Sequence, residues 1–294
     1  MPQDGAGARV SPIIVAGAKG ILGSAFMAGL PPGRAVGLGS ADLDATAPEA
    51  AMRRVVALAP SVIVNCAADT DVEGAETDDS RSVAVNISLA RALAEAARET
   101  GARFVHFSST GCYGNWKTAP YEESDPLRPT TAHHRSKARG EEAVLQTLPE
   151  ALILRLGLVF GGSPGQRKNF VSARLREAEG KAVIGSDPSQ VGSPTGAADV
   201  VGQVMHLLDQ PAADGIFNCV GGGPPISRLG YVAAILAYAE RQTSVEPAVF
   251  QRRAAVSANE AAVNRRLQEF GAERMPPWRL SLAAFVTSLN RPTV

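Results

Sequence analysis

The chain contains few cysteines, few aromatic residues and no excess of charge of either sign. Cys66, Cys112 and Cys219 are too few and too scattered among 294 residues for a disulfide framework or a cysteine-based zinc site. Basic and acidic side chains number 29 each, so no broad positive field is available for nucleic acid or an anionic membrane surface. No apolar run reaches the roughly 18 residues of a membrane-spanning helix, and the polar N-terminus lacks a signal-peptide pattern. These absences predict a cytoplasmic protein with no nucleic-acid, membrane or metal partner.

The composition is that of a folded globular chain. Hydrophobic residues make up 45% and charged residues 20% of the sequence, which argues against intrinsic disorder. A chain of 294 residues forms one large domain or two small ones and buries a core without disulfides or metals.

Short β-branched runs alternate with helical patterns at least five times in the first 160 residues. This alternation predicts a doubly wound parallel sheet, a Rossmann-type α/β fold with helices on both faces. The expected strands are 10–16, 35–38, 62–65, 104–108 and 152–156, and the expected helices are 21–30, 47–58, 83–100 and 135–148.

The pattern changes after residue 160. Glycine–proline loops occur at 161–165 and 221–225, helices are expected at 170–180 and 197–208, and one more strand is expected at 216–220. The rest of the chain reads as mainly helical. We therefore expect a sheet domain at 10–160, to which 195–220 return, and a smaller lobe built from 161–194 and 221–294.

A glycine-rich turn joins the first strand to the first helix, with glycines at the first, fourth and seventh positions. Such glycines allow a tight turn and a close approach of backbone to a pyrophosphate, and the following helix N-terminus presents N–H groups to the phosphates. The alternative is a plain strand-to-helix turn. The context predicts a dinucleotide site at Gly17, Ala18, Lys19, Gly20, Ile21, Leu22 and Gly23.

The end of the second strand, Gly37 to Ser40, carries no acidic residue to bind a ribose 2′-hydroxyl. Lys19 could instead meet a 2′-phosphate, so NADP(H) is favoured over NAD, with Ser40 beside it. Asp42 and Leu43 could lie along the edge of the adenine ring. The alternatives are a solvated loop lysine at 19 and a helix-capping aspartate at 42.

Together with later segments, these residues resemble the extended short-chain dehydrogenase/reductase family. The resemblance covers nearly the whole chain, and the short second lobe is most similar to dTDP-4-dehydrorhamnose reductases. It implies an NADPH-dependent ketoreductase with a small-molecule ketone substrate bound by the second lobe and with Ala67 and Ala68 beside the cofactor. The matching segments are Asp42-Leu43, Val64 to Ala68, Phe107 to Ser109, Tyr113-Gly114, Arg155, Val159 to Gly161, Pro194-Thr195, Asp199-Val200 and Pro277-Trp278.

The family's catalytic residues transfer to this sequence with one exception. The resemblance places the carbonyl-binding hydroxyl at Ser109, with Thr110 next to it, and the ribose-binding lysine at Lys137. The proton-donating tyrosine belongs four residues before the lysine, and here that residue is His133.

His133 shares a helix face with Lys137, but an imidazole reaches about 2 Å less far than a phenol. It could act through a water or as imidazolium, although Lys137 opposes a second positive charge. The alternative is an idle histidine at the helix start, like its neighbour His134. Tyr113 and Tyr121 are other phenols nearby in the sequence, and Tyr113 matches a family position that is not the donor.

Loss of the tyrosine favours a ketone that supplies its own acid. A carbonyl flanked by a phenol, as in aromatic polyketides, is already hydrogen-bonded, whereas a sugar ketone has no such help. The sequence is similar to atypical family members without the tyrosine, the angucyclinone ketoreductases. We therefore expect reduction of an angucyclinone-like polyketide in antibiotic biosynthesis by substrate-assisted hydride transfer.

Two other functions remain open. A dTDP-4-keto-6-deoxysugar reductase would use basic residues of the second lobe for the diphosphate, although a solvated helix face is the favoured explanation of these residues. These residues are Arg167, Lys168, Arg174 and Arg176. A non-catalytic NADP(H)-binding sensor would also lack the tyrosine, but retention of Ser109 and Lys137 argues against it. An oligomer that pairs through the helices near 83–100 and 135–148 is also possible.

Overall fold

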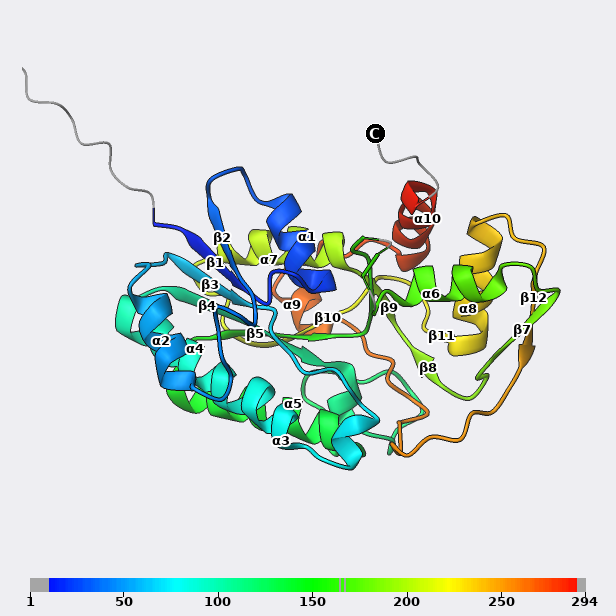
Figure 1. Cartoon of the computed structure of the whole chain (residues 1–294), viewed down its shortest axis with the longest axis horizontal. Coiled ribbons are helices and arrows are strands. Elements are labelled where there is room, and N and C mark those ends of the chain that lie inside the picture. Colours follow the sequence, from blue (N-terminus) through cyan, green and yellow to red (C-terminus); the bar gives the residue numbers. More distant parts are fainter. Residues whose placement is uncertain (1–10, 164, 167, 290–294) are drawn as a thin grey trace, which may run out of the picture.

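A six-stranded parallel sheet forms the centre of the molecule in a computed structural model that describes residues 11–163, 165, 166 and 168–289 (Figure 1). The strand order β10-β5-β4-β3-β1-β2 is a doubly wound arrangement, as the alternating pattern predicts. Its strands are β1 (Ile13–Ala16), β2 (Ala35–Leu38), β3 (Val62–Asn65), β4 (Arg103–Ser109), β5 (Leu152–Leu156) and β10 (Gly215–Cys219).

Helices cover both faces of this sheet (Figure 1). On one face, Phe26 of α1 (Ile21–Gly29), Val204 of α7 (Ala197–Leu208) and Leu267 of α9 (Arg265–Glu269) share a core with alternate strand residues. On the other face, a second core includes Val55 of α2 (Pro48–Val56) and Val144 of α5 (Ala132–Thr147). The strands are almost continuously apolar because both faces are buried.

The helical segment that connects β3 to β4 packs in the second core and is not a uniform α-helix. It consists of α3 (Ser80–Val83), a π-helical segment η2 (Ala84–Leu89) and α4 (Ala90–Thr100). It ends at Gly101, whose left-handed φ of 70° matches the predicted C-cap. Two short 3₁₀ turns, η1 (Gly74–Glu76) and η3 (Thr110–Tyr113), follow β3 and β4.

The remaining strands form three two-stranded sheets. They pair β6 (Leu158–Phe160) with β9 (Pro194–Gly196), β7 (Val183–Ser186) with β12 (Ser244–Pro247), and β8 (Val191–Gly192) with β11 (Ile226–Ser227). A third core joins these segments to α6 (Phe170–Ala178), α8 (Arg228–Tyr238) and α10 (Trp278–Leu289), with Tyr231 and Trp278 among its largest buried side chains.

Most expected elements occur within a few residues of their expected bounds. The strands at 35–38, 62–65 and 152–156 and the helix at 197–208 are confirmed as predicted. The expectation of a mainly helical C-terminal part is wrong, because this part contains β11 and β12 and because residues 248–264 form neither helix nor extended strand. Tyr121, Asn115 and Glu73 instead hold this stretch by hydrogen bonds to its backbone. Residues 1–9 and Val10 lie outside the described residues. Within the described ranges, every helix is too short or too polar to span a membrane.

Candidate active site

The glycine-rich turn has the geometry of a phosphate-binding loop. Gly17 has a φ of 75°, and a Cβ there would lie 2.7 Å from the Ala67 backbone nitrogen. A Cβ at Gly23 would lie 2.2 Å from the Gly17 carbonyl oxygen. Both positions therefore require glycine. Gly20 caps α1 without a side-chain hydrogen bond, and the first turn contains no acidic residue. The N-terminal N–H groups of α1 thus remain available to an anion, which fits a dinucleotide pyrophosphate.

A cavity of about 660 Å³ extends from this turn past the end of β2, where the adenosine end of a dinucleotide would lie. Lys19, Gly20, Ser40 and Leu43 line it, as do Ala67 and Ala68. Asn65 shapes the alanine turn, because its Oδ1 accepts the Ala67 N–H at 3.1 Å. Ala18 does not line the cavity; its N–H instead donates to the Leu38 carbonyl.

Two charged residues that the sequence reading omitted also line this cavity. Asp44 accepts hydrogen bonds from the N–H and hydroxyl of Thr46. Arg81 is mostly exposed, and its Nε lies 3.6 Å from a carboxylate oxygen of Asp69. No sequence motif points to Asp44 or Arg81, because both lie beyond the glycine motif. Asp44 lies in a loop, and Arg81 lies at the start of α3.

Asp42 does not have its expected place beside the adenine. One carboxylate oxygen accepts the Gly39 N–H at 3.0 Å, and the other lies 2.8 Å from Arg54 Nη2. The carboxylate therefore stabilises the loop after β2, and Leu43 alone of this pair lines the cavity.

A second cavity of about 660 Å³ continues along the carboxyl ends of β1, β3 and β4. It shares Lys19, Gly20, Cys66 and Ala68 with the first, so the two form one groove. Ile21 and Leu22 line its wall, and Ser109, His133 and Lys137 meet in it. The groove lies at the switch point of the strand order, where α/β sheets bind ligands.

Lys137 is the buried cation of this groove. Its side chain is 4% exposed, and Nζ donates a hydrogen bond to the Phe107 carbonyl. Burial lowers the pKa of Lys137 to about 8.

His133 is buried beside it. Burial, with smaller contributions from His134 and Lys137, lowers the pKa of His133 to about 3. Its Nδ1 has no hydrogen-bond partner within the described chain. The imidazole is therefore neutral near pH 7, and the expectation that it could donate a proton as imidazolium is wrong.

Ser109 and Thr110 differ in their placement. The Ser109 Oγ accepts the Gly111 N–H at 3.2 Å, which leaves its hydroxyl proton free to bind a carbonyl oxygen. Thr110 is 1% exposed and lines neither the groove nor the cavities next to it, so the structure does not bring it to the site.

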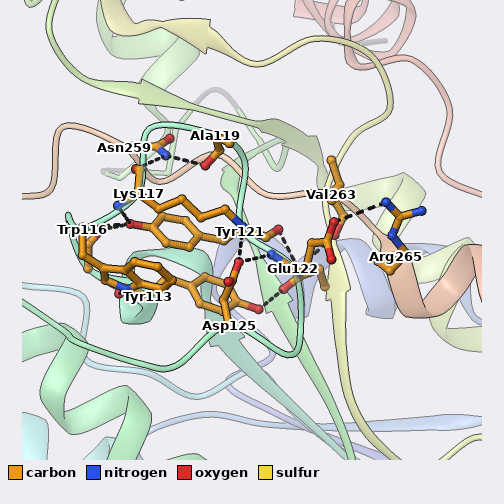
Figure 2. A network of polar contacts seen from close by, with 12 residues as sticks. Tyr113, Trp116, Lys117, Ala119, Tyr121, Glu122, Asp125, Asn259, Val263 and Arg265 are labelled. Carbon is orange, nitrogen blue, oxygen red and sulfur yellow. Dashed lines mark hydrogen bonds and ion pairs between the residues drawn. The ribbon is translucent and has the colours of Figure 1, made fainter.

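Tyr113 and Tyr121 belong to a polar network outside the groove (Figure 2). The Tyr113 hydroxyl donates to Asn218, and burial raises its pKa to about 12. Tyr121 donates to the Gly114 carbonyl and stacks on Tyr113 with ring centroids 4.9 Å apart. Lys117 and Asp125 close the loop with an ion pair of 2.6 Å. Neither phenol can replace the missing donor.

Asn86 is a positioning residue that the sequence reading missed. Its side-chain oxygen accepts a hydrogen bond from the Asp69 N–H. Its side-chain nitrogen donates to the Asp69 carbonyl and, at 2.8 Å, to the Ser136 hydroxyl. Ser136 in turn donates to the His133 carbonyl. A Cβ at Gly140 would lie 2.2 Å from the Asn86 carbonyl oxygen, so glycine permits this close helix contact. The sequence does contain a sign of this role, because Asn86 is a polar residue within an otherwise apolar helix. It lies in the π-helical segment.

A third cavity, of about 330 Å³, opens on the other side of Ser109. Its polar lining includes His134, Arg228, Tyr231, Arg252 and Glu260. The two cavities meet beside four residues that line both of them, Thr70, Ser109, Gly157 and Val159.

The basic residues that could hold a diphosphate have different surroundings where the structure describes them. Lys168 donates to Thr70 Oγ1, and Arg174 pairs with Glu177 at 2.7 Å. Arg176 is exposed on α6, and Arg167 lies outside the described residues.

Comparison with protein families finds a match over residues 11–291 to the RmlD substrate binding domain. Among characterised relatives, the dTDP-4-dehydrorhamnose reductase of Mycobacterium tuberculosis is 34% identical over 97% of this chain and 94% of its own length. A probable dTDP-4,6-dihydroxy-2-methyloxan-3-one 4-ketoreductase of Streptomyces antibioticus is 33% identical over 71% of each chain.

Solved structures agree with this match. A dTDP-4-dehydrorhamnose reductase of Clostridium acetobutylicum superposes with a TM-score of 0.90 at 25% identity, covering 95% of this chain and 100% of its own. The Bacillus anthracis dTDP-4-dehydrorhamnose reductase in complex with NADP gives 0.89 at 25% identity, covering 95% and 99%.

Proposed function

Because this chain belongs to the dTDP-4-dehydrorhamnose reductase family of extended short-chain dehydrogenases/reductases, and is thus an NAD(P)H-dependent reductase, we propose that it reduces a ketone with NADPH where the groove meets the Ser109 cavity. The observation that carries this proposal is the position of Ser109. Ser109 lines both the cofactor groove and the smaller cavity, so a substrate carbonyl bound beside it would face both.

The residues of the groove have separable roles. NADPH, when bound, supplies the hydride that adds to the carbonyl carbon. The glycine turn and the α1 N-terminus would hold its pyrophosphate, and Lys137 would bind its nicotinamide ribose. Ser109 donates to the carbonyl oxygen, and the buried Lys137 charge stabilises the alkoxide that develops. His133 is neutral and supplies no ready proton, so the alkoxide must take its proton from the substrate or from water.

The first substrate candidate is a dTDP-4-keto-6-deoxysugar. Its support is the identity of the relatives, whose match extends over 97% of this chain. Residues 161–194 and the parts of 221–294 that pack in the third core would then form the substrate lobe, while 10–160 and 195–220 hold the cofactor.

The second candidate is an aromatic polyketide ketone next to a phenol, of the angucyclinone kind. One specific observation favours it: the family's tyrosine position holds a buried histidine with a pKa of about 3. A substrate with an internal phenol brings its own proton and hydrogen bond, so it needs no such tyrosine.

NADPH is the preferred cofactor in this proposal. Lys19 is exposed in the cavity beyond β2, and Ser40 lines the same cavity. These groups suit a 2′-phosphate.

The test is NADPH oxidation by the purified protein with each substrate class, in wild type, His133→Phe and Ser109→Ala. We expect turnover that falls about 100-fold in Ser109→Ala, as for loss of an oxyanion donor. Activity that survives His133→Phe would show that the protein provides no acid at 133. Turnover of the sugar alone would select the first candidate, and turnover of the polyketide alone the second. NADPH binding without turnover of either substrate would contradict the proposal and favour a sensor.

A further inference from the structure

Arg228 occupies an unfavourable position for a cation. It is the first residue of α8, an 11-residue helix whose N-cap Ser227 accepts the Gly230 N–H at 3.1 Å. The N-terminus of a helix carries partial positive charge, so a guanidinium there is repelled rather than stabilised. Helix stability alone does not account for this arginine.

The Arg228 guanidinium is also unpaired within the part of the chain that the structure describes. It is half-buried in the cavity of about 330 Å³ and lies 5.0 Å from the centre of the Phe170 ring. Glu260 lines the same cavity, but it does not come within ion-pair distance of Arg228. Two neighbouring arginines have partners of their own, because Arg252 pairs with Glu73 and Arg174 with Glu177.

Tyr231 adds a second, independent unsatisfied group. It follows Arg228 by three residues, so both side chains lie on one face of α8. Its ring stacks on Phe170 with centroids 5.6 Å apart, and its side chain is 1% exposed. The hydroxyl has no partner among the described residues, although a buried hydroxyl normally has one. Burial raises the pKa of Tyr231, so the hydroxyl keeps its proton and can donate it in a hydrogen bond.

We propose that Arg228 and Tyr231 form a subsite for an anionic, oxygen-bearing group of the substrate, at a distance from the ketone that is reduced. The proposal rests on the proposed function, since it assigns the third cavity to the same substrate. The anion satisfies two side-chain donors that lack a partner among the described residues, and the aromatic ring of Phe170 packs against both side chains. A phosphate of a nucleotide diphosphate and the carboxylate or phenolate of an aromatic compound share this chemistry.

The test uses the full chain saturated with NADP⁺, so that the cofactor site is filled. Thermal stability is followed while dTDP, inorganic diphosphate or salicylate is added to wild type, Arg228→Gln, Tyr231→Phe and Arg176→Gln. The last variant is the matched control, because it removes the same charge from an exposed position on α6. We expect a ligand-induced rise in Tm that disappears in Arg228→Gln, shrinks in Tyr231→Phe and persists in Arg176→Gln.

The two sources of the anion are distinguished by the ligand that shifts Tm. A shift with dTDP and diphosphate identifies a phosphate, and a shift with salicylate alone identifies an aromatic acid. With a turned-over substrate, loss of a charged hydrogen bond should raise KM in Arg228→Gln about tenfold to hundredfold, with kcat nearly unchanged.

Three results would overturn the subsite. These are ligand shifts that are equal in wild type and Arg228→Gln, absence of a shift with any of the three ligands, and a Tyr231→Phe variant that loses kcat with an altered pH profile at constant KM. The last result would make Tyr231 a proton donor. Failure of the proposed function is seen separately, as absence of NADPH oxidation with either substrate class.

Discussion

A buried neutral histidine sets the acid–base character of the candidate site at the scale of single residues. His133 faces the groove from the position where the family has a tyrosine, and it cannot hold a proton near pH 7. Lys137 keeps a positive charge beside it below pH about 8. The groove therefore stabilises negative charge on a reduced carbonyl better than it delivers a proton.

His133 should make the fold sensitive to acid. Its pKa is about 3 in the folded chain and 6.5 when unfolded, so the unfolded state binds more protons below pH 6.5. Stability present above pH 6.5 is then lost as the pH falls toward 3, and this group alone costs about 2 kcal/mol between pH about 7.5 and about 5. Urea denaturation at the two pH values should show a smaller loss for His133→Gln than for wild type. Equal losses in the two proteins would refute this account of the buried imidazole.

Lys19 should determine the cofactor preference. It is exposed and lines the cavity beyond β2, so Lys19→Ser should raise the KM for NADPH about tenfold and leave that for NADH nearly unchanged. The control is Lys181→Ser, which removes an equally exposed lysine from the second lobe. Equal effects on both cofactors would place the 2′-phosphate elsewhere.

At the scale of secondary-structure elements, helix ends and close helix contacts position the site. The start of α1 presents N–H groups to the groove, and α5 presents His133 and Lys137 from one face. Asn86 connects the π-helical segment to α5 through Ser136. These contacts depend on glycine at a few positions where a side chain would collide.

Alanine substitutions at two glycines in open surroundings separate the effect of backbone conformation on stability from the effect of packing. A Cβ added at Gly101 or at Gly202 would meet no described atom within 4 Å, but Gly101 ends α4 with a φ of 70° and Gly202 lies inside α7. We expect Gly101→Ala to destabilise the fold by about 1 kcal/mol and Gly202→Ala to stabilise it by about 0.5–1 kcal/mol. Chemical denaturation measures both, and a stabilising Gly101→Ala would contradict the left-handed cap.

At the scale of the whole molecule, the C-terminal segment completes the sheet domain as well as the second lobe. Leu267, Ala272 and Met275 belong to the core on one face of the main sheet. The Asn264 side chain also accepts a hydrogen bond from the Val220 N–H and donates one to the Val220 carbonyl, just after β10.

The chain should therefore unfold as one unit rather than lobe by lobe. A chain that ends at residue 263 lacks these core side chains and should show no cooperative thermal transition by circular dichroism. Full-length protein should give a single transition that shifts upward with NADP⁺. A cooperative, cofactor-binding truncated chain would show that the sheet domain is independent of the C-terminal segment.

The sequence by itself determined the fold class and the position of the glycine-rich turn. Both depend on local patterns: short apolar runs alternating with helices, and three glycines spaced over the turn after β1 and the first turn of α1. It also singled out Ser109, His133 and Lys137, which the structure brings together in the groove, because a resemblance transfers residues by their order along the chain. The irregular path of 248–264 had no such local pattern, since its shape comes from hydrogen bonds to distant loops.

Only the tertiary structure decided which side chains face the groove and in which state of protonation. Thr110 lies next to Ser109 in sequence but is buried outside the groove, and Asp42 pairs with Arg54 twelve residues later. The low pKa of His133 comes from burial by segments that are remote in sequence. Arg228 and Tyr231 share a cavity with Ser109 only because α8 packs across it. Burial and pairing arise from long-range packing, and residue order does not encode them in any local pattern.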